Sequence, residues 1–202
     1  MSQSKKLSKD FYAGPDVLGI ARELLGKILV SRQDGFTCSG RIVELEAYAG
    51  ISDKASHAFG GRRTNRTEIM YASGGVAYVY LCYGIHHLFN VVTGEKDTPH
   101  AILIRALEPL EGTEKMLQRT GRKKADHTLM SGPGRLSKAL GIHKGMSGQS
   151  LLSGSLFITD DGFRPAKNTV LTGPRIGVEY AGADALLPYR FYLKGHAAVS
   201  RR

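Results

Sequence analysis

Three segments between residues 41 and 107 have the residue pattern of β-strands, and they restrict the possible folds more than any other feature. They read RIVELEAY (41–48), GVAYVYLCYG (75–84) and HAILIRAL (100–107). They are rich in aromatic and β-branched residues, which suit the pleated, half-buried surface of a sheet. HLFNVV (87–92) follows the second segment after a short turn, which predicts a β-hairpin. We therefore expect an antiparallel sheet at the core of the fold.

Helical patterns flank these strands. Asp16 is a candidate N-cap for a helix that reaches Leu25. KILVS (27–31) and the strand at 41–48 enclose an Asp-Gly turn signal, so they predict a second hairpin. The remaining predicted elements are a long loop at 48–73, helices at about 112–120 and 133–141, and short strands at 156–159, 175–178 and 189–195.

Together the patterns predict the fold class α+β. We expect a single mixed domain with a curved antiparallel β-sheet core, packed helices and a protruding β-hairpin. A chain of 202 residues is long enough to bury a hydrophobic core without disulfides. We expect the domain to span residues 11–202 and the charged stretch 1–10 to form a flexible basic N-terminus.

The chain is basic, with 28 Lys and Arg against 18 Asp and Glu and a net charge of +10. A basic domain suits nucleic acid, phosphorylated ligands or an anionic membrane surface. No apolar run approaches the ~20 residues that span a bilayer, and the N-terminus lacks the apolar stretch of a signal peptide. We therefore expect an intracellular protein without a membrane partner. Because metal-ligand spacings and cofactor motifs are missing from the sequence, we expect no metal and no cofactor.

The positive charge is concentrated between Gly112 and Lys144, a stretch that holds eight basic and two acidic residues. SGPGRL within it predicts a helix that starts near Pro133. Arg135 and Lys138, beside the free amides of that helix, would suit a phosphate. A plain helix N-cap and a solvated basic helix pair explain the same residues, so these alternatives stay open.

RIVELEAY carries two carboxylates on one face of its strand. Alternation places Val43, Leu45 and Ala47 on the core face, and the opposite face carries Ile42, Glu44, Glu46 and Tyr48. That second face is either a solvated edge or the wall of a polar cleft. Carboxylates at this spacing lie ~6.7 Å apart along a strand, which resembles the acid–base separation of an inverting glycosidase.

Three further residues are unusual for their positions. Tyr83 lies at the tip of the predicted hairpin, where an aromatic ring has little to pack against and could enter a base stack. Asn90 and Arg105 interrupt apolar strands, and a buried arginine needs an anion. Glu46 would be such a partner across the sheet. A purely structural Arg–carboxylate pair is an equal alternative.

In the order and spacing of several sequence blocks, the chain resembles the alkyladenine (3-methyladenine, methylpurine) DNA glycosylases. The resemblance rests on RIVELEAYAG, SDKASHAFGGRRTNR, AYVYLCYG, LIRALEPLEG, SGPGRL and RIGVEYAG. It covers nearly the whole chain beyond the first ten residues. His87 and the segment TGEKDTPH (93–100) depart from the family pattern. Both lie near the expected mouth of the base pocket, and the sequence leaves open whether hypoxanthine and ethenoadenine are substrates.

The resemblance implies a monofunctional DNA base-excision repair glycosylase. Such an enzyme flips an alkylated or deaminated purine out of duplex DNA and hydrolyses its N-glycosidic bond, which leaves an abasic site. In this family Glu46 would be the general base. With Arg105 and the backbone carbonyl of Ile176, Glu46 would hold the attacking water.

The resemblance also implies how the DNA is held. Tyr48, His57 and Tyr80 would sandwich the flipped base, and Asn90 would exclude the 2-amino group of a normal guanine. Tyr83 would intercalate in the duplex. Four residues are expected to contact DNA phosphates: Arg62, Thr64, Arg135 and Lys138.

The expected partner is double-stranded DNA that contains damaged purines, and the protein is expected to act as a monomer located with the DNA. Three other functions compete with this one. The chain could be a non-catalytic basic module that binds lesions, a helix-hairpin-helix glycosylase, or a sugar hydrolase that uses Glu44 and Glu46. The strand-rich sequence disfavours the second, and the positive charge and lack of tryptophan disfavour the third.

Overall fold

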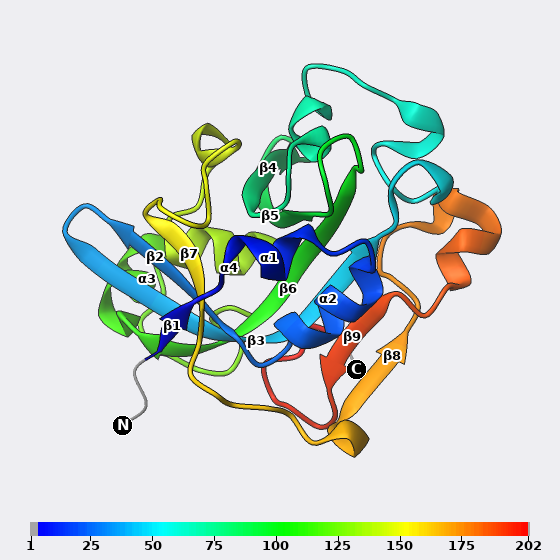
Figure 1. Ribbon diagram of the computed structural model, residues 1–202. Helices are drawn as coiled ribbons and strands as arrows, with labels where there is room; N and C mark the ends of the chain where they lie inside the picture. The colour runs from blue at the N-terminus through cyan, green and yellow to red at the C-terminus, as the bar shows by residue number, and fades with distance from the viewer. Residues whose placement is uncertain (1–3, 202) are drawn as a thin grey trace.

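An antiparallel sheet runs through the computed structural model, which describes residues 4–201 (Figure 1). Its main order is β1-β7-β2-β3-β6-β5-β4, and β9 pairs with β3 and β8. The strands are β1 (Lys5–Lys6), β2 (Ile28–Gln33), β3 (Phe36–Tyr48), β4 (Val76–Cys82), β5 (His86–Thr93), β6 (His100–Glu111), β7 (Leu156–Asp160), β8 (Val170–Gly173) and β9 (Arg190–Leu193).

Four α-helices within residues 4–201 pack around this sheet. They are α1 (Lys9–Ala13), α2 (Val17–Leu24), α3 (Thr113–Thr120) and α4 (Pro133–Leu140). Asp16 caps α2 as expected, because its carboxylate accepts hydrogen bonds from the amides of Leu18 and Gly19 at 3.1 and 2.9 Å. Short 3₁₀ turns fill the connections at Gly50–Ser52, Phe59–Gly61, Glu68–Tyr71, Lys144–Met146, Lys167–Thr169 and Glu179–Leu186. The predicted α+β class and single mixed domain are confirmed.

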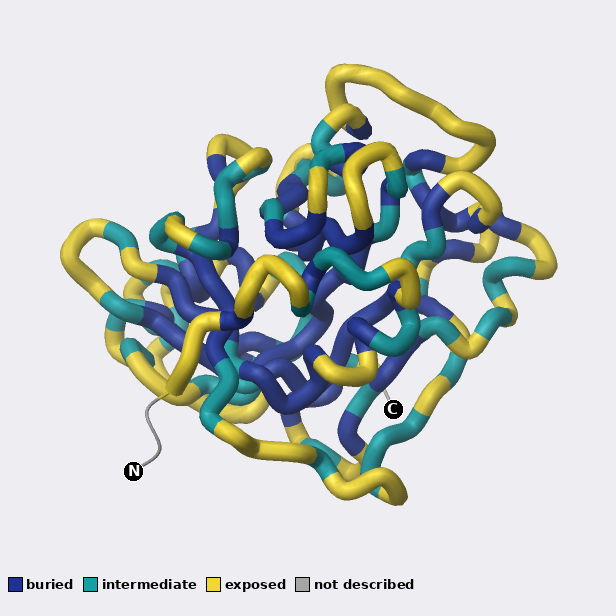
Figure 2. The backbone as a smooth tube through the Cα atoms, in the orientation of Figure 1, coloured by how far each residue is buried: buried dark blue, intermediate teal, exposed yellow. Residues whose placement is uncertain are grey.

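The main hydrophobic core joins the sheet to the helices. Leu24 of α2, Leu45 of β3 and Leu140 of α4 are fully buried in the same cluster. Figure 2 shows that buried backbone follows the middle of the sheet, whereas exposed backbone lies in the connecting loops. Each such side chain contributes ~1.5–3 kcal/mol by leaving water. The core therefore gives the residues on the central strands fixed positions.

A pair of bulges alters the register between β3 and β6. Ile42 pairs with Leu107 and Glu44 pairs with Ala106, so Val43 has no partner in the ladder. Leu45 then pairs with Ile104, so Arg105 has no partner either, and the register is again the one that relates Ile42 to Leu107. Simple alternation placed Ile42 on the glutamate face, and this was wrong. Ile42 and Val43 are both buried in the main core, because the extra residue of a bulge reorients its neighbour.

Two predicted strand boundaries differ in the structure. Residues 175–178 do not form a strand, because the Arg175 side chain turns inward and Gly177 adopts a positive φ of 75°. The strand forms instead at β8, just before this segment. β6 also continues past Pro109, which pairs with Gly40. A Cβ on Gly40 would lie 2.9 Å from the carbonyl oxygen of Glu108, so only glycine permits this close approach.

Part of the N-terminal segment pairs with the sheet. Residues 1–3 lie outside the described part of the chain. Lys5–Lys6 pair with β7, and the amide of Leu7 donates to the carbonyl of Ile158 at 3.0 Å. Leu7 itself is buried. Where it is described, the segment expected to be flexible therefore extends the sheet, because its backbone hydrogen bonds and one apolar side chain attach it.

Candidate active site

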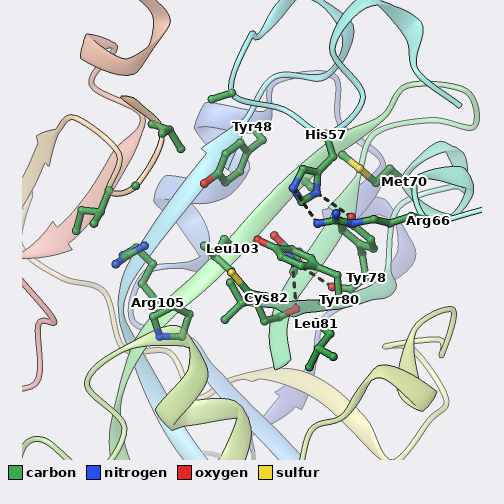
Figure 3. Close-up of a pocket in the computed structure, with 18 of the residues that line it drawn as sticks. Tyr48, His57, Arg66, Met70, Tyr78, Tyr80, Leu81, Cys82, Leu103 and Arg105 are labelled. Carbon is green, nitrogen blue, oxygen red and sulfur yellow. Dashed lines mark hydrogen bonds between the residues drawn. The ribbon is translucent and has the colours of Figure 1, made fainter. Parts of the chain in front are cut away.

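A pocket of about 400 Å³ opens where β3, β4, β5 and β6 meet the loops after β3 and β8 (Figure 3). Its lining includes most of the residues expected from the sequence: Tyr48, His57, Tyr80, Tyr83, Asn90, Arg105 and Ile176. The fold thus brings together side chains that are as far apart in the chain as Tyr48 and Ile176. The volume is typical of a small-molecule site.

Glu46 lies behind the wall of this pocket and is fully buried. One carboxylate oxygen, Oε1, accepts from the backbone amide of Ile176 at 2.7 Å and contacts Nη1 of Arg105 at 3.2 Å. The other oxygen, Oε2, accepts from the hydroxyl of Tyr48 at 2.9 Å. Burial raises the pKa of Glu46, while Arg105, the amide of Ile176 and the Tyr48 hydroxyl oppose that shift.

Glu44 is buried beside Glu46 and contacts the same arginine. Its Oε1 lies 3.1 Å from Nε of Arg105 and 3.5 Å from Nε of Arg190. Its Oε2 accepts from the backbone amide of Ser200 at 2.6 Å. The solvated edge considered for this face is ruled out, because this part of β3 lies between β6 and β9. The polar face of the strand is an enclosed network of ions.

Aromatic rings form two sides of the pocket. Figure 3 shows Tyr48 on one side, facing Tyr80 and His57 across the cavity. The rings of His57 and Tyr80 meet edge-on, with centroids 4.8 Å apart, and Nδ1 of His57 lies 2.8 Å from the hydroxyl of Tyr78. Burial and the Glu46 carboxylate raise the pKa of the Tyr48 hydroxyl well above 10, so it stays a donor to Glu46. A flat ring could lie between these walls.

Arg175 and Asp53 support one of these walls, and the sequence analysis missed both. Nη2 of Arg175 donates to Oδ1 of Asp53 at 2.8 Å, and Nη1 donates to the carbonyl of Ala47 at 2.9 Å. The guanidinium carbon lies 4.8 Å from the centre of the Tyr48 ring. The pair attaches the loop after β3 to the segment that carries Ile176. An arginine within a predicted apolar strand was the available signal.

Asn90 lies on the floor of the pocket and is buried. Its side-chain amide donates to the carbonyl oxygens of Tyr78 at 3.2 Å and Leu88 at 3.4 Å. These bonds fix the orientation of the side chain, because both amide hydrogens are directed to the backbone. Asn90 is therefore a rigid part of the floor.

Tyr83 lies at the tip of the β4–β5 hairpin, as the sequence predicted, and its side chain is 89% exposed. The amide of Ile85 donates to the carbonyl of Cys82, and both residues between them have positive φ, 50° at Tyr83 and 73° at Gly84. Positive φ is uncommon for a bulky residue and costs energy. Neither burial nor a relaxed backbone accounts for a tyrosine at this position.

The four residues expected at phosphates lie outside the pocket lining, and all are exposed. Arg62 and Thr64 belong to the loop that also carries His57, whereas Arg135 and Lys138 are on α4. Pro133 at the start of α4 does line the pocket. A Cβ on Gly134 would lie 2.9 Å from the ring of His86, so α4 begins directly against the hairpin. The two pairs of residues expected at phosphates thus lie on separate segments, and each segment reaches the pocket.

Residues 4–201 contain no cluster of three or more His, Cys, Asp or Glu side chains that could hold a metal ion. Within the same residues, no helix has the length and apolar character needed to cross a bilayer.

Known proteins match nearly the whole chain. The family model described as methylpurine-DNA glycosylase matches residues 10–197. A Bacillus cereus protein is 47% identical over 200 residues, which cover 95% of this chain and 97% of that protein. Proteins from Desulfitobacterium hafniense and Clostridium perfringens are 43% and 42% identical, over 97% and 98% of this chain and 98% and 100% of their own length. The names of all three assign them provisionally as 3-methyladenine DNA glycosylases.

Proposed function

The chain belongs to the methylpurine-DNA glycosylase family, and on that premise we propose that it excises damaged purines from duplex DNA by base flipping and water attack. Its reaction class is the hydrolysis of an N-glycosyl bond. The observation that carries the proposal is the position of Glu46. Its carboxylate is buried directly behind an aromatic pocket and is held by Arg105, Tyr48 and the amide of Ile176.

Glu46 acts as the general base in this mechanism. It takes a proton from water as the water oxygen attacks the anomeric carbon of the flipped nucleotide, and the purine leaves with the electrons of the broken bond. The carboxylate must be ionised to do this. Arg105, the Ile176 amide and the Tyr48 hydroxyl each favour the ionised form. The negative charge also offsets the positive charge that develops on the sugar.

The backbone of Ile176 contributes a second group besides the expected carbonyl. The family resemblance implied that its carbonyl holds the water, whereas the structure shows its amide donating to Glu46. One residue can do both, because the amide orients the carboxylate while the carbonyl remains free to accept from water. We propose this double use of the Ile176 backbone.

The residues around the pocket would hold the flipped base and select which bases enter. Tyr48 on one side, with His57 and Tyr80 on the other, offers stacking surfaces to any purine. Asn90 on the floor is held rigidly and would contact the 2-amino group of guanine. Tyr83, exposed beside the pocket mouth, would fill the gap that the flipped nucleotide leaves in the duplex.

The exposed basic residues account for duplex binding. Arg62 and Thr64 on one segment, and Arg135 and Lys138 on α4, would contact phosphates on either side of the flipped nucleotide. A net charge of +10 favours this contact. We propose that the protein binds as a monomer and is located with the DNA.

The decisive experiment uses methylated duplex DNA. The protein should release free 3-methyladenine, detected by chromatography, and should leave alkali-labile abasic sites without cutting the strand itself. A deoxyinosine duplex would test release of a deaminated purine. The competing function is a non-catalytic lesion-binding module. Tight binding of methylated DNA with no base released would favour that alternative and overturn the proposal.

A further inference from the structure

Arg66 contacts both rings on one side of the pocket, although neither the sequence patterns nor the family resemblance singled it out. Its Nη2 lies 3.1 Å from Nε2 of His57, and its guanidinium carbon lies 4.8 Å from the centre of the Tyr80 ring. Figure 3 shows the guanidinium beside His57, Tyr78 and Tyr80, away from Tyr48. Arg66 is exposed, and it lines both this pocket and an adjoining second cavity of about 740 Å³. It therefore belongs to the wall of the pocket, next to the rings that a flipped base would contact.

The contact with Arg66 determines the protonation of His57. A guanidinium can only donate, so Nε2 of His57 must be the acceptor. The proton then lies on Nδ1, which donates to the hydroxyl of Tyr78 at 2.8 Å. Burial and the charges of Arg66 and Arg62 lower the pKa of His57 from 6.5 to about 4. Near neutral pH the imidazole is uncharged, and Arg66 supplies the positive charge of this wall.

No carboxylate in residues 4–201 compensates Arg66. The buried Arg105 contacts both Glu44 and Glu46. Arg190 contacts Glu44, and Arg175 is paired with Asp53. On the same loop as Arg66, Arg63 is paired with Glu68 and Asp97. Arg66 forms no ion pair within 4.0 Å in the described residues, and its partners there are aromatic rings. The wall of the pocket thus carries a cation, Arg66, that has no carboxylate within 4.0 Å in the described residues.

We propose that Arg66 determines which class of damaged purine the pocket prefers, because its charge disfavours cationic alkylpurines relative to neutral ones. The inference rests on the proposed function. Alkylation of a ring nitrogen in a purine nucleotide leaves the base positively charged, whereas deamination of adenine leaves neutral hypoxanthine. Arg66 also contacts Tyr80, so the ring that would attract a cationic base is already engaged with a cation.

The size of the effect follows from distance and screening. The guanidinium carbon of Arg66 lies 4.8 Å from the centre of the Tyr80 ring, so a base beside that ring would lie several ångströms from the charge, and because the side chain is exposed, solvent screens the charge in part. At an effective dielectric constant of about 20 to 40, two like charges ~7 Å apart change a binding constant by roughly ten- to fiftyfold. We expect the lower part of that range.

The test compares two lesions in wild type, Arg66→Gln and Arg66→Lys. The lesions are 3-methyladenine and hypoxanthine in duplexes of the same sequence, and the readout is the single-turnover rate of base release. Neither base carries a 2-amino group, so Asn90 affects both alike. Arg66→Gln keeps a donor for His57 but removes the charge, whereas Arg66→Lys keeps the charge. Arg135→Gln is the control for loss of charge at the proposed DNA-binding surface.

The ratio of the 3-methyladenine rate to the hypoxanthine rate should rise about tenfold in Arg66→Gln. It should stay within about threefold of wild type in Arg66→Lys and Arg135→Gln. Equal changes on both lesions in Arg66→Gln would show a structural or phosphate-contact role and overturn the inference. If wild type releases no hypoxanthine, the test rests on 3-methyladenine alone. An equal 3-methyladenine rate in Arg66→Gln and wild type would then overturn the inference. Wild type that releases neither base would instead contradict the proposed function itself.

Discussion

Glu44 and Glu46, two residues apart on β3, bind the same guanidinium. Nε of Arg105 contacts Glu44 at 3.1 Å, and Nη1 contacts Glu46 at 3.2 Å. Both carboxylates are fully buried, and the bulges at Val43 and Arg105 bring the three side chains to one side of the ladder. Because Glu44 is also bonded to the amide of Ser200, the position of Arg105 depends on the C-terminal segment.

Glu46→Gln should abolish most activity while the protein still folds and binds lesion DNA. The amide can still accept from Ile176, but it can neither accept a proton from water nor offset positive charge on the sugar. Loss of a general base typically slows a reaction ~10²–10⁴-fold. Single-turnover release of 3-methyladenine measures the effect, with the exposed Glu23→Gln on α2 as the matched control. A Glu46→Gln rate within tenfold of wild type would exclude Glu46 as the base.

Glu44→Gln should slow excision less than Glu46→Gln does. It should also move the acid limb of the excision rate to lower pH. The Glu44 charge raises the pKa of Glu46, so its removal lowers the pH at which Glu46 becomes ionised. In wild type, burial keeps that pKa above its ordinary 4.5, and activity should be lost as pH falls through the raised value. Rates of excision at a series of pH values test this. An unshifted acid limb would show that the two carboxylates are not coupled.

Tyr83→Ala should weaken lesion binding and slow excision from duplex, since nothing would then fill the gap left by the flipped base. The stability of Tyr83→Ala should differ little from wild type, because the ring is 89% exposed. Tyr83→Gly should be slightly more stable than wild type, because glycine adopts the positive φ of this position without strain. Thermal unfolding and duplex excision are measured side by side. A large fall in melting temperature for Tyr83→Ala would contradict the exposed position of this ring.

Asn90→Ser should increase the release of guanine-derived bases relative to adenine-derived ones. The shorter side chain removes the obstacle to the 2-amino group, at the cost of the bonds to Tyr78 and Leu88. Loss of hydrogen bonds of this kind costs ~0.5–1.5 kcal/mol each, so the protein should remain folded. Chromatography of bases released from methylated DNA gives the ratio. If total release falls and the ratio stays constant, Asn90 has only a structural role.

Binding of undamaged duplex should weaken steeply with salt, because each phosphate contact contributes about −0.9 to the slope of log K against log salt. Arg135→Gln combined with Lys138→Gln should make that slope shallower by roughly 2. The charge-matched control is Lys167→Gln combined with Lys194→Gln, because both lysines are exposed and lie outside the pocket lining. Equal slopes in all three proteins would remove α4 from the DNA interface.

The sequence alone was sufficient for the outline of the fold. Strand patterns at 41–48 and 75–107 predicted the central sheet, and Asp16 predicted the start of α2. These signals are local: period-two alternation, turn residues and caps act within a few residues of chain. The position of Tyr83 at an exposed hairpin tip followed from the same local signals.

Tertiary structure decided how the site is built. Bulges in β3 and β6, the inward turn of Arg175, and the contact of Arg66 with His57 have no local pattern. Several of the contacts join partners far apart in the chain, such as Asp53 with Arg175 and Ser200 with Glu44. A buried charge is stable only where the fold supplies its partner, and periodicity says nothing about which distant residue that is. The sequence therefore determined which residue types reach the pocket. Packing decided which charged side chains there have an oppositely charged partner, and that Arg66 has no carboxylate within 4.0 Å in the described residues.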